Sequence, residues 1–160
     1  MFLNKRYKQA SVAFQRAGRH REVMICDAYC LREKAWSVST AVSATRIEAF
    51  DTAAKAFTNC AQDYSPVKRI NERLTYYGIA GECFSEACDL KNAADSYRMA
   101  ERYSAAACAY REGGYFDEMV EVITQHENTI DGGLLERLTM VARMYYFKVQ
   151  FHSLPASEYL

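Results

Sequence analysis

Six cysteines and three histidines are the residues of this chain that could bind a metal ion. A structural zinc site needs a full set of such ligands, usually with close pairs a few residues apart. The closest cysteine pairs are Cys26 with Cys30 and Cys83 with Cys88, and both fall within helical apolar patterns. The histidines lie far from one another in the sequence, at His20, His126 and His152. The residue pattern therefore predicts no metal site.

Catalytic groups are also weakly indicated. Nucleophilic catalysis needs a thiol or hydroxyl beside a base, and no local pattern here pairs one with the other. Glu82, Glu86 and Asp89 have the spacing of an ordinary solvated helix face. The glycine pairs at 113–114 and 132–133 lack the strand and helix that flank a phosphate-binding loop, and they fit turns instead. We predict that this chain is not an enzyme and binds no cofactor.

The cysteines fit a packing role better than a chemical one. A chain without a secretion signal is expected to keep its thiols reduced, and free cysteine is among the most buried residue types. We predict small buried thiols at Cys26, Cys60, Cys83, Cys88 and Cys108.

Basic residues gather near the N-terminus, although the whole chain has 20 basic and 20 acidic residues and no net charge. Lysine and arginine contacts to phosphates position a nucleic acid without reading its sequence. The aromatic residues between them, Tyr7 and Phe14, belong to an apolar stripe, so no base-stacking platform is predicted. Nucleic-acid binding is an alternative function that we do not favour. Its candidate phosphate contacts are Arg6, Lys8, Arg16, Arg19 and Arg21.

A repeated helical pattern carries most of these residues. A large apolar residue is followed by a small residue three places on, an aromatic residue four further, and a small residue three further. These offsets put all four residues on one face of an α-helix. Helices that cannot bury such a face alone are the units of helical-repeat proteins. The copies are Leu90, Ala93, Tyr97 and Ala100; Tyr103, Ala106, Tyr110 and Gly113; Tyr7, Ala10, Phe14 and Ala17; Phe50, Ala53, Phe57 and Cys60; and a looser Phe116, Met119, Ile123 and His126.

Several residues mark the expected ends of these helices. Gly18 stands where glycine favours the end of a helix. Thr45 and Glu48 have the spacing of a capping box. Ser65 and Pro66 fit an N-cap followed by a proline in the first turn. The predicted helices cover Asn4–Ala17, Arg21–Trp36, Arg46–Gln62, residues 66–87, three short units after Asp89, and Leu134–Val149.

The pattern predicts one domain over residues 1–150 and a frayed tail over residues 151–160. Gly78 and Gly81, inside the fourth helix, indicate the close approach of another helix, since glycine there costs up to about 1 kcal/mol against alanine. The sequence has no apolar run of about 20 residues and no signal-peptide pattern. We therefore expect an intracellular protein, cytoplasmic or nuclear, without a membrane partner.

The runs YKQASVAFQRAGRHREV and YGIAGECFSEACDLKNAADSYRMAERYSAAACAYREGG carry the repeated pattern. They resemble the helical-repeat region of large fungal proteins that join a superfamily-one, UvrD-like helicase to tetratricopeptide-like repeats, relatives of the tetratricopeptide and ankyrin repeat-containing proteins. The resemblance covers about residues 4–125. It implies an all-α fold of about eight helices, arranged as antiparallel hairpins in a right-handed, tetratricopeptide-like α-solenoid.

The resemblance also implies that the chain is a fragment of a larger protein, because its first helix resembles the second member of a repeat pair. The helicase motifs are absent from this sequence: it has no G-x-x-x-x-G-K-[ST] and no paired acidic box. Any ATPase would therefore lie in another part of such a protein.

The predicted function follows from the same resemblance. In tetratricopeptide-like arrays the first helix of each pair lines a groove that binds peptides. By this analogy a protein or peptide partner would contact Tyr29, Arg32, Trp36, Arg73 and Tyr77. An equally consistent interpretation buries Tyr29 and Trp36 in the core. We expect a non-catalytic interaction or scaffold module, with a structural spacer between domains as a further alternative, and an exposed end helix would also permit a homodimer.

The small residues of the pattern generate a test of the helix packing. Each should sit against a neighbouring helix, so Ala93→Phe or Ala106→Phe should lower the free energy of unfolding by about 1–3 kcal/mol through overpacking. Thermal unfolding measures this change, and an unchanged midpoint would contradict the placement. The predicted core comprises Tyr7, Ala10, Phe14, Phe50, Ala53, Phe57, Leu74, Phe84, Ala93, Tyr97, Ala106 and Tyr110.

Overall fold

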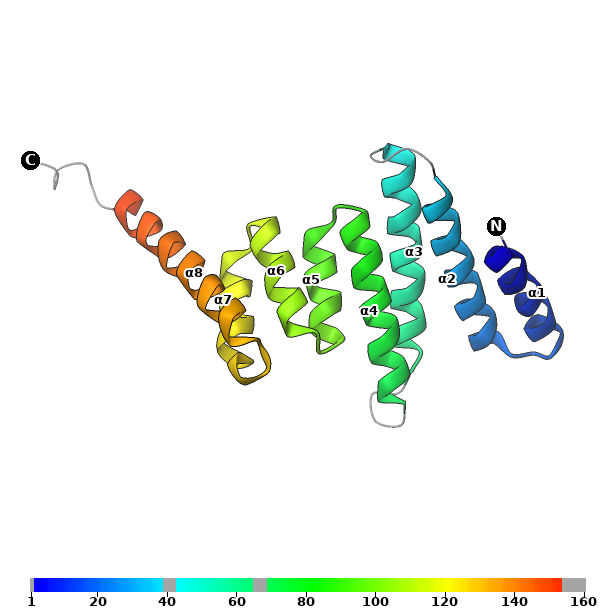
Figure 1. Ribbon diagram of the computed structural model, residues 1–160. Helices are drawn as coiled ribbons and strands as arrows, with labels where there is room; N and C mark the ends of the chain where they lie inside the picture. Colours follow the sequence, from blue (N-terminus) through cyan, green and yellow to red (C-terminus); the bar gives the residue numbers. More distant parts are fainter. Residues whose placement is uncertain (1, 39–42, 65–68, 154–160) are drawn as a thin grey trace, which may run out of the picture.

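The computed structural model describes residues 2–38, 43–64 and 69–153. Over these ranges the chain forms eight α-helices and a short 3-10 helix, with no strand, which confirms the predicted all-α class. Figure 1 shows the helices in an elongated row in chain order, with α1 and α8 at opposite ends. The elements are α1 (Phe2–Arg16), α2 (His20–Ser37), α3 (Ala44–Gln62), α4 (Ile70–Glu86), α5 (Leu90–Met99), α6 (Tyr103–Gly113), α7 (Phe116–Gln125), η1 (Glu127–Thr129) and α8 (Gly132–Ser153).

A short turn of one geometry joins four pairs of consecutive helices. In each turn one residue has a positive φ, in the left-handed region that glycine adopts without strain. Two of the four residues are glycines, and the other two are a cysteine and a glutamate. Their φ angles are 68° at Gly18, 59° at Cys88, 58° at Glu101 and 78° at Gly114.

The residue after the left-handed one closes each turn with a backbone hydrogen bond. Its N–H donates to the carbonyl of an aromatic residue five positions earlier, which is the Schellman arrangement for a helix end. The same residue is the N-cap of the next helix, so it ends one helix and begins another. The N···O distances are 2.9 Å for Arg19 to Phe14, 2.9 Å for Asp89 to Phe84, 2.8 Å for Arg102 to Tyr97 and 2.8 Å for Tyr115 to Tyr110.

The cap of α3 and the end of α8 differ from the predictions. Ser43, not Thr45, caps α3: its backbone is extended and its hydroxyl accepts the N–H of Arg46 at 3.2 Å, while Thr45 lies inside the helix. The last helix runs on to Ser153, past the predicted end at Val149. The predicted start at residues 65–66 and the tail from residue 154 lie outside the described residues.

The core contains most of the predicted residues. Seven of them are buried: Phe50, Ala53, Phe57, Phe84, Ala93, Ala106 and Tyr110. Tyr7, Ala10, Phe14, Leu74 and Tyr97 are half-buried instead. For the three on α1 the reason is position, because this helix lies at the end of the row with α2 beside it (Figure 1).

The two glycines inside α4 do mark close approaches. A Cβ on Gly81 would come within 2.7 Å of the Tyr97 ring on α5. A Cβ on Gly78 would come within 2.8 Å of the Arg102 guanidinium, which belongs to the turn between α5 and α6. The neighbours are thus side chains of the following segment rather than another helix backbone.

The left-handed residues generate a stability prediction. Glu101→Gly should raise the free energy of unfolding by up to about 1 kcal/mol, because it removes the strain of a side chain at positive φ. Gly114→Ala should lower it by about the same amount. Chemical denaturation measures both changes. Glu101→Ala is the matched control, since it removes the carboxylate but keeps the strain, and an equal gain in this variant would contradict the account.

Candidate functional site

Two of the five predicted groove residues, Arg32 and Trp36, line one small cavity. It has a volume of about 170 Å³ and lies between α2, α3 and α4. Its lining is aromatic on one side and carboxylate on the other. The complete set is Arg32, Trp36, Phe50, Glu82, Cys83 and Glu86.

Arginines of the chain already pair with both carboxylates of this cavity. Glu82 accepts from Arg32 at 3.2 Å through one oxygen and from Arg102 at 3.0 Å through the other. Glu86 accepts from Arg46 at 2.9 Å. The Arg46 guanidinium also lies 5.2 Å from the centre of the Trp36 ring. Because arginines of the chain pair with both carboxylates, these contacts stabilise the packing of the helices. They leave neither Glu82 nor Glu86 unpaired for a ligand.

The other three predicted groove residues lie elsewhere. Tyr29 stacks on Tyr7 at a centroid distance of 4.9 Å and meets the edge of Phe57 at 5.1 Å, so it joins α1, α2 and α3. Tyr77 is buried, and the Arg73 guanidinium covers its ring at 5.4 Å. The five residues therefore do not form one continuous surface.

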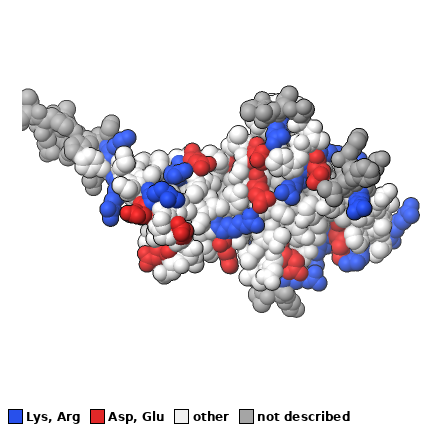
Figure 2. All heavy atoms as spheres, in the orientation of Figure 1, with Lys and Arg blue, Asp and Glu red and all other residues white. Residues whose placement is uncertain are grey.

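Two of the five basic residues near the N-terminus are held by carboxylates. Arg19 pairs with Glu22, and Arg21 pairs with Asp63 at the C-terminal end of α3. The Arg19 contact lowers the pKa of Glu22. On the face that Figure 2 displays, basic and acidic side chains are interspersed along the row. Among the described residues, Arg6, Lys8 and Arg16 are exposed without a carboxylate partner.

The cysteines are all free thiols. Cys26, Cys60 and Cys83 are buried as predicted, and Cys30, which the prediction did not include, is buried too. Burial raises the pKa of Cys60 to about 11 and that of Cys83 to about 11. The prediction is wrong for Cys88, which is exposed because it occupies a left-handed turn position rather than a helix face. Cys108 is half-buried. Within the described ranges, no three His, Cys, Asp or Glu side chains are grouped so that they could hold a metal ion.

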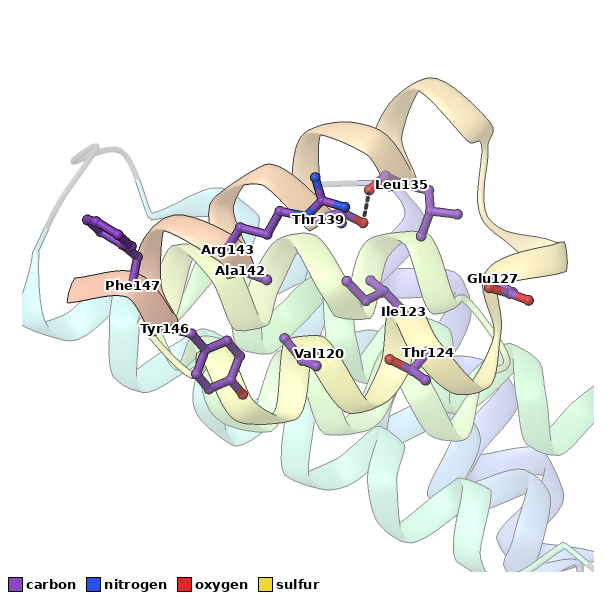
Figure 3. Close-up of a pocket in the computed structure, with 10 residues that line it drawn as sticks. All are labelled: Val120, Ile123, Thr124, Glu127, Leu135, Thr139, Ala142, Arg143, Tyr146 and Phe147. Atoms are coloured by element: carbon purple, nitrogen blue, oxygen red, sulfur yellow. Dashed lines mark hydrogen bonds between the residues drawn. The ribbon is translucent and has the colours of Figure 1, made fainter. Parts of the chain in front are cut away.

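The sequence analysis did not predict a groove that lies between α7 and α8. Its volume is about 530 Å³, and Figure 3 shows α7 side chains on one wall and α8 side chains on the other. The Tyr146 hydroxyl closes one end by donating to Asp117 at 2.8 Å. The lining residues are Val120, Ile123, Thr124, Glu127, Leu135, Thr139, Ala142, Arg143, Tyr146 and Phe147.

An exposed apolar stripe runs along α8 beside this groove. Met140 is 61% exposed, Met144 is 63% exposed and Phe147 is 61% exposed. Their spacing of four and then three places them on one helix face. The opposite face of α8 supplies Leu138 and Ala142 to the core. This stripe could have been predicted from the sequence, because α8 carries a second apolar face in addition to the one that it buries in the core.

Comparisons with known proteins add no relative. No family model matches the chain, and searches of curated proteins and of solved structures find no match. None of the described helices combines the length and the hydropathy needed to cross a bilayer. The candidate function therefore follows from the surfaces of the chain itself.

The thiol environments generate a labelling prediction. In the native protein at mildly alkaline pH, Cys88 should react fastest with iodoacetamide, whereas Cys60 and Cys83 should react only after unfolding. Their raised pKa values keep them protonated below about pH 11, and the thiolate is the reactive form. Peptide mapping by mass spectrometry measures the three rates. Cys88→Ser should remove the fast phase, and native labelling of Cys60 or Cys83 at the rate of Cys88 would contradict the structure.

Proposed function

We propose that this chain is a non-catalytic protein-interaction module whose α8 stripe and α7–α8 groove receive a helix of a partner protein. The observation that supports this proposal is the exposure of Met140 and Met144 beside a groove of about 530 Å³. Contiguous exposed apolar patches on soluble proteins mark interaction surfaces.

The chemistry of the surface suits a helical partner. An amphipathic helix presents side chains at spacings of three and four residues and lies in an apolar groove. Methionine side chains are flexible and polarisable, so they adapt to the shape of an opposing face. Arg143 and Glu127 lie at the same groove, and each offers a charge that could orient the partner.

We also propose that the row of helices is a right-handed array of antiparallel hairpins, as in tetratricopeptide-like proteins. The recurring short turns and the packing of each helix on the next support this arrangement. The relation to a helicase-linked repeat region rests on the sequence runs alone. An intracellular setting is part of the proposal, since the six cysteines are free and disulfides are rare inside cells.

Affinity capture with matched variants tests the interaction. The tagged chain is incubated with extract of its source cell, and bound proteins are quantified by mass spectrometry. Replacing Met140 and Met144 together by serine should reduce capture of a specific partner by about tenfold or more, because central apolar contacts supply most of the binding energy. The matched control replaces Val12 and Met24, exposed apolar residues on α1 and α2, and should leave capture unchanged.

Other outcomes would contradict this proposal. Equal capture by both variants would remove α8 from the interaction. Capture that disappears with nuclease, and with Arg6, Lys8 and Arg16 replaced by glutamine, would favour the nucleic-acid alternative. A dimer in light scattering that the α8 variant converts to a monomer would assign the stripe to a second copy of the chain. No specific capture would favour a structural spacer.

A further inference from the structure

A second groove crosses α3, α4 and α5, away from the α7–α8 groove. Its volume is about 360 Å³, within the range of ligand pockets. Two walls of similar spacing face each other across it. One wall carries Lys55, Thr58, Asn59 and Gln62 of α3, and the other carries Asn92, Asp95, Ser96 and Met99 of α5, with Tyr77 and Phe84 of α4 between them.

Ser96 is the unusual residue of this groove. It is 7% exposed and is the buried polar side chain of the described core. The structure gives its hydroxyl no hydrogen-bond partner among the described residues. A buried hydroxyl without a partner is unfavourable, so a ligand in this groove that supplies the missing hydrogen bond would bind favourably to Ser96.

The groove offers amide groups, and its two charged residues each have a partner within the chain. Lys55 donates to Asp51 at 2.6 Å, and Asp95 accepts the hydroxyl of Tyr110. Asn59 and Gln62 are exposed and their side chains have no partner in the described part of the chain. Asn92 uses its amide nitrogen on Asp89 at 2.7 Å, which leaves its amide oxygen available. Amide side chains provide one donor group and one acceptor each, which matches the peptide bond.

The length of the walls sets the length of the ligand. Each wall spans seven residue steps of an α-helix, which is about 10 Å. An extended chain advances about 3.3 Å per residue, so the groove accommodates about three residues. Met99, which is exposed, lies at one end of its wall and would contact an apolar side chain.

We infer that this groove binds an extended, uncharged peptide segment of a partner protein through its backbone. Ser96, Asn92, Asn59 and Gln62 hydrogen-bond the peptide N–H and C=O groups, and Tyr77 and Phe84 of α4 line the groove between the two walls. This site is separate from the α7–α8 surface. It also lies apart from the cavity at Arg32 and Trp36, where the carboxylates are occupied.

A phage-displayed library of random linear peptides, selected on the full chain, provides the probe. Enriched sequences are synthesised with capped ends and titrated by calorimetry against the wild type and the variants. Ser96→Ala, which removes a buried hydroxyl, and Asn59→Ala, which removes an exposed amide, should each weaken binding by about tenfold, as expected for a lost hydrogen bond. Gln15→Ala, which removes an exposed amide on α1, is the matched control and should change nothing.

Ser96→Ala should also raise the thermal midpoint, because it removes a buried hydroxyl that has no hydrogen-bond partner among the described residues. Replacement of Met140 and Met144 by serine should leave peptide binding intact, so failure of the α8 proposal and failure of this one are distinguishable. The inference is overturned if no peptide is enriched, if binding survives both groove variants, or if the enriched peptides depend on a charged side chain.

Discussion

This structure depends on one recurring backbone hydrogen bond. In it, the N–H of the residue that begins one helix donates to the carbonyl of an aromatic residue near the end of the preceding helix. It recurs at Arg19, Asp89, Arg102 and Tyr115 with N···O distances of 2.8–2.9 Å. Because one residue both closes a helix and caps the next, the path of the chain between the two helices is fixed within a few residues. The aromatic side chains on the carbonyl side then fill the space between neighbouring helices.

The candidate binding surfaces follow from this arrangement. When each helix packs mainly on its neighbours in the chain, grooves form between successive helices and no large enclosed cavity is required. The groove at α7 and α8 is bordered by exposed methionines, while the lining of the groove over α3, α4 and α5 includes three amide side chains and Ser96. We propose a different partner for each surface, a helix face for the first and an extended backbone for the second.

The fold class and much of the core could be predicted from the sequence, because apolar residues at offsets of three and four report a helix face directly. The turns at Cys88 and Glu101 could not, since neither residue type signals a left-handed conformation.

The cap at α3 was placed on the wrong residue because Ser43 and Thr45 are both good caps and only the backbone conformation separates them. His126 occupies a position where the repeated pattern has a small residue. In the structure its ring stacks on the ring of Tyr103, with 3.5 Å between the ring centres. The groove prediction grouped residues of two helices. It could not include the contacts of Arg46, whose guanidinium lies over the Trp36 ring and donates to the Glu86 carboxylate.

Amide hydrogen exchange followed by nuclear magnetic resonance tests the recurring turn most directly. The amides of Arg19, Asp89, Arg102 and Tyr115 belong to residues between helices, where an ordinary linker would exchange rapidly with solvent. The account predicts that all four are protected like the amides in the helices that follow them, because each is bonded to an aromatic residue's carbonyl. Exchange of these amides at the rate of an open loop, while the helices themselves stay protected, would contradict the account.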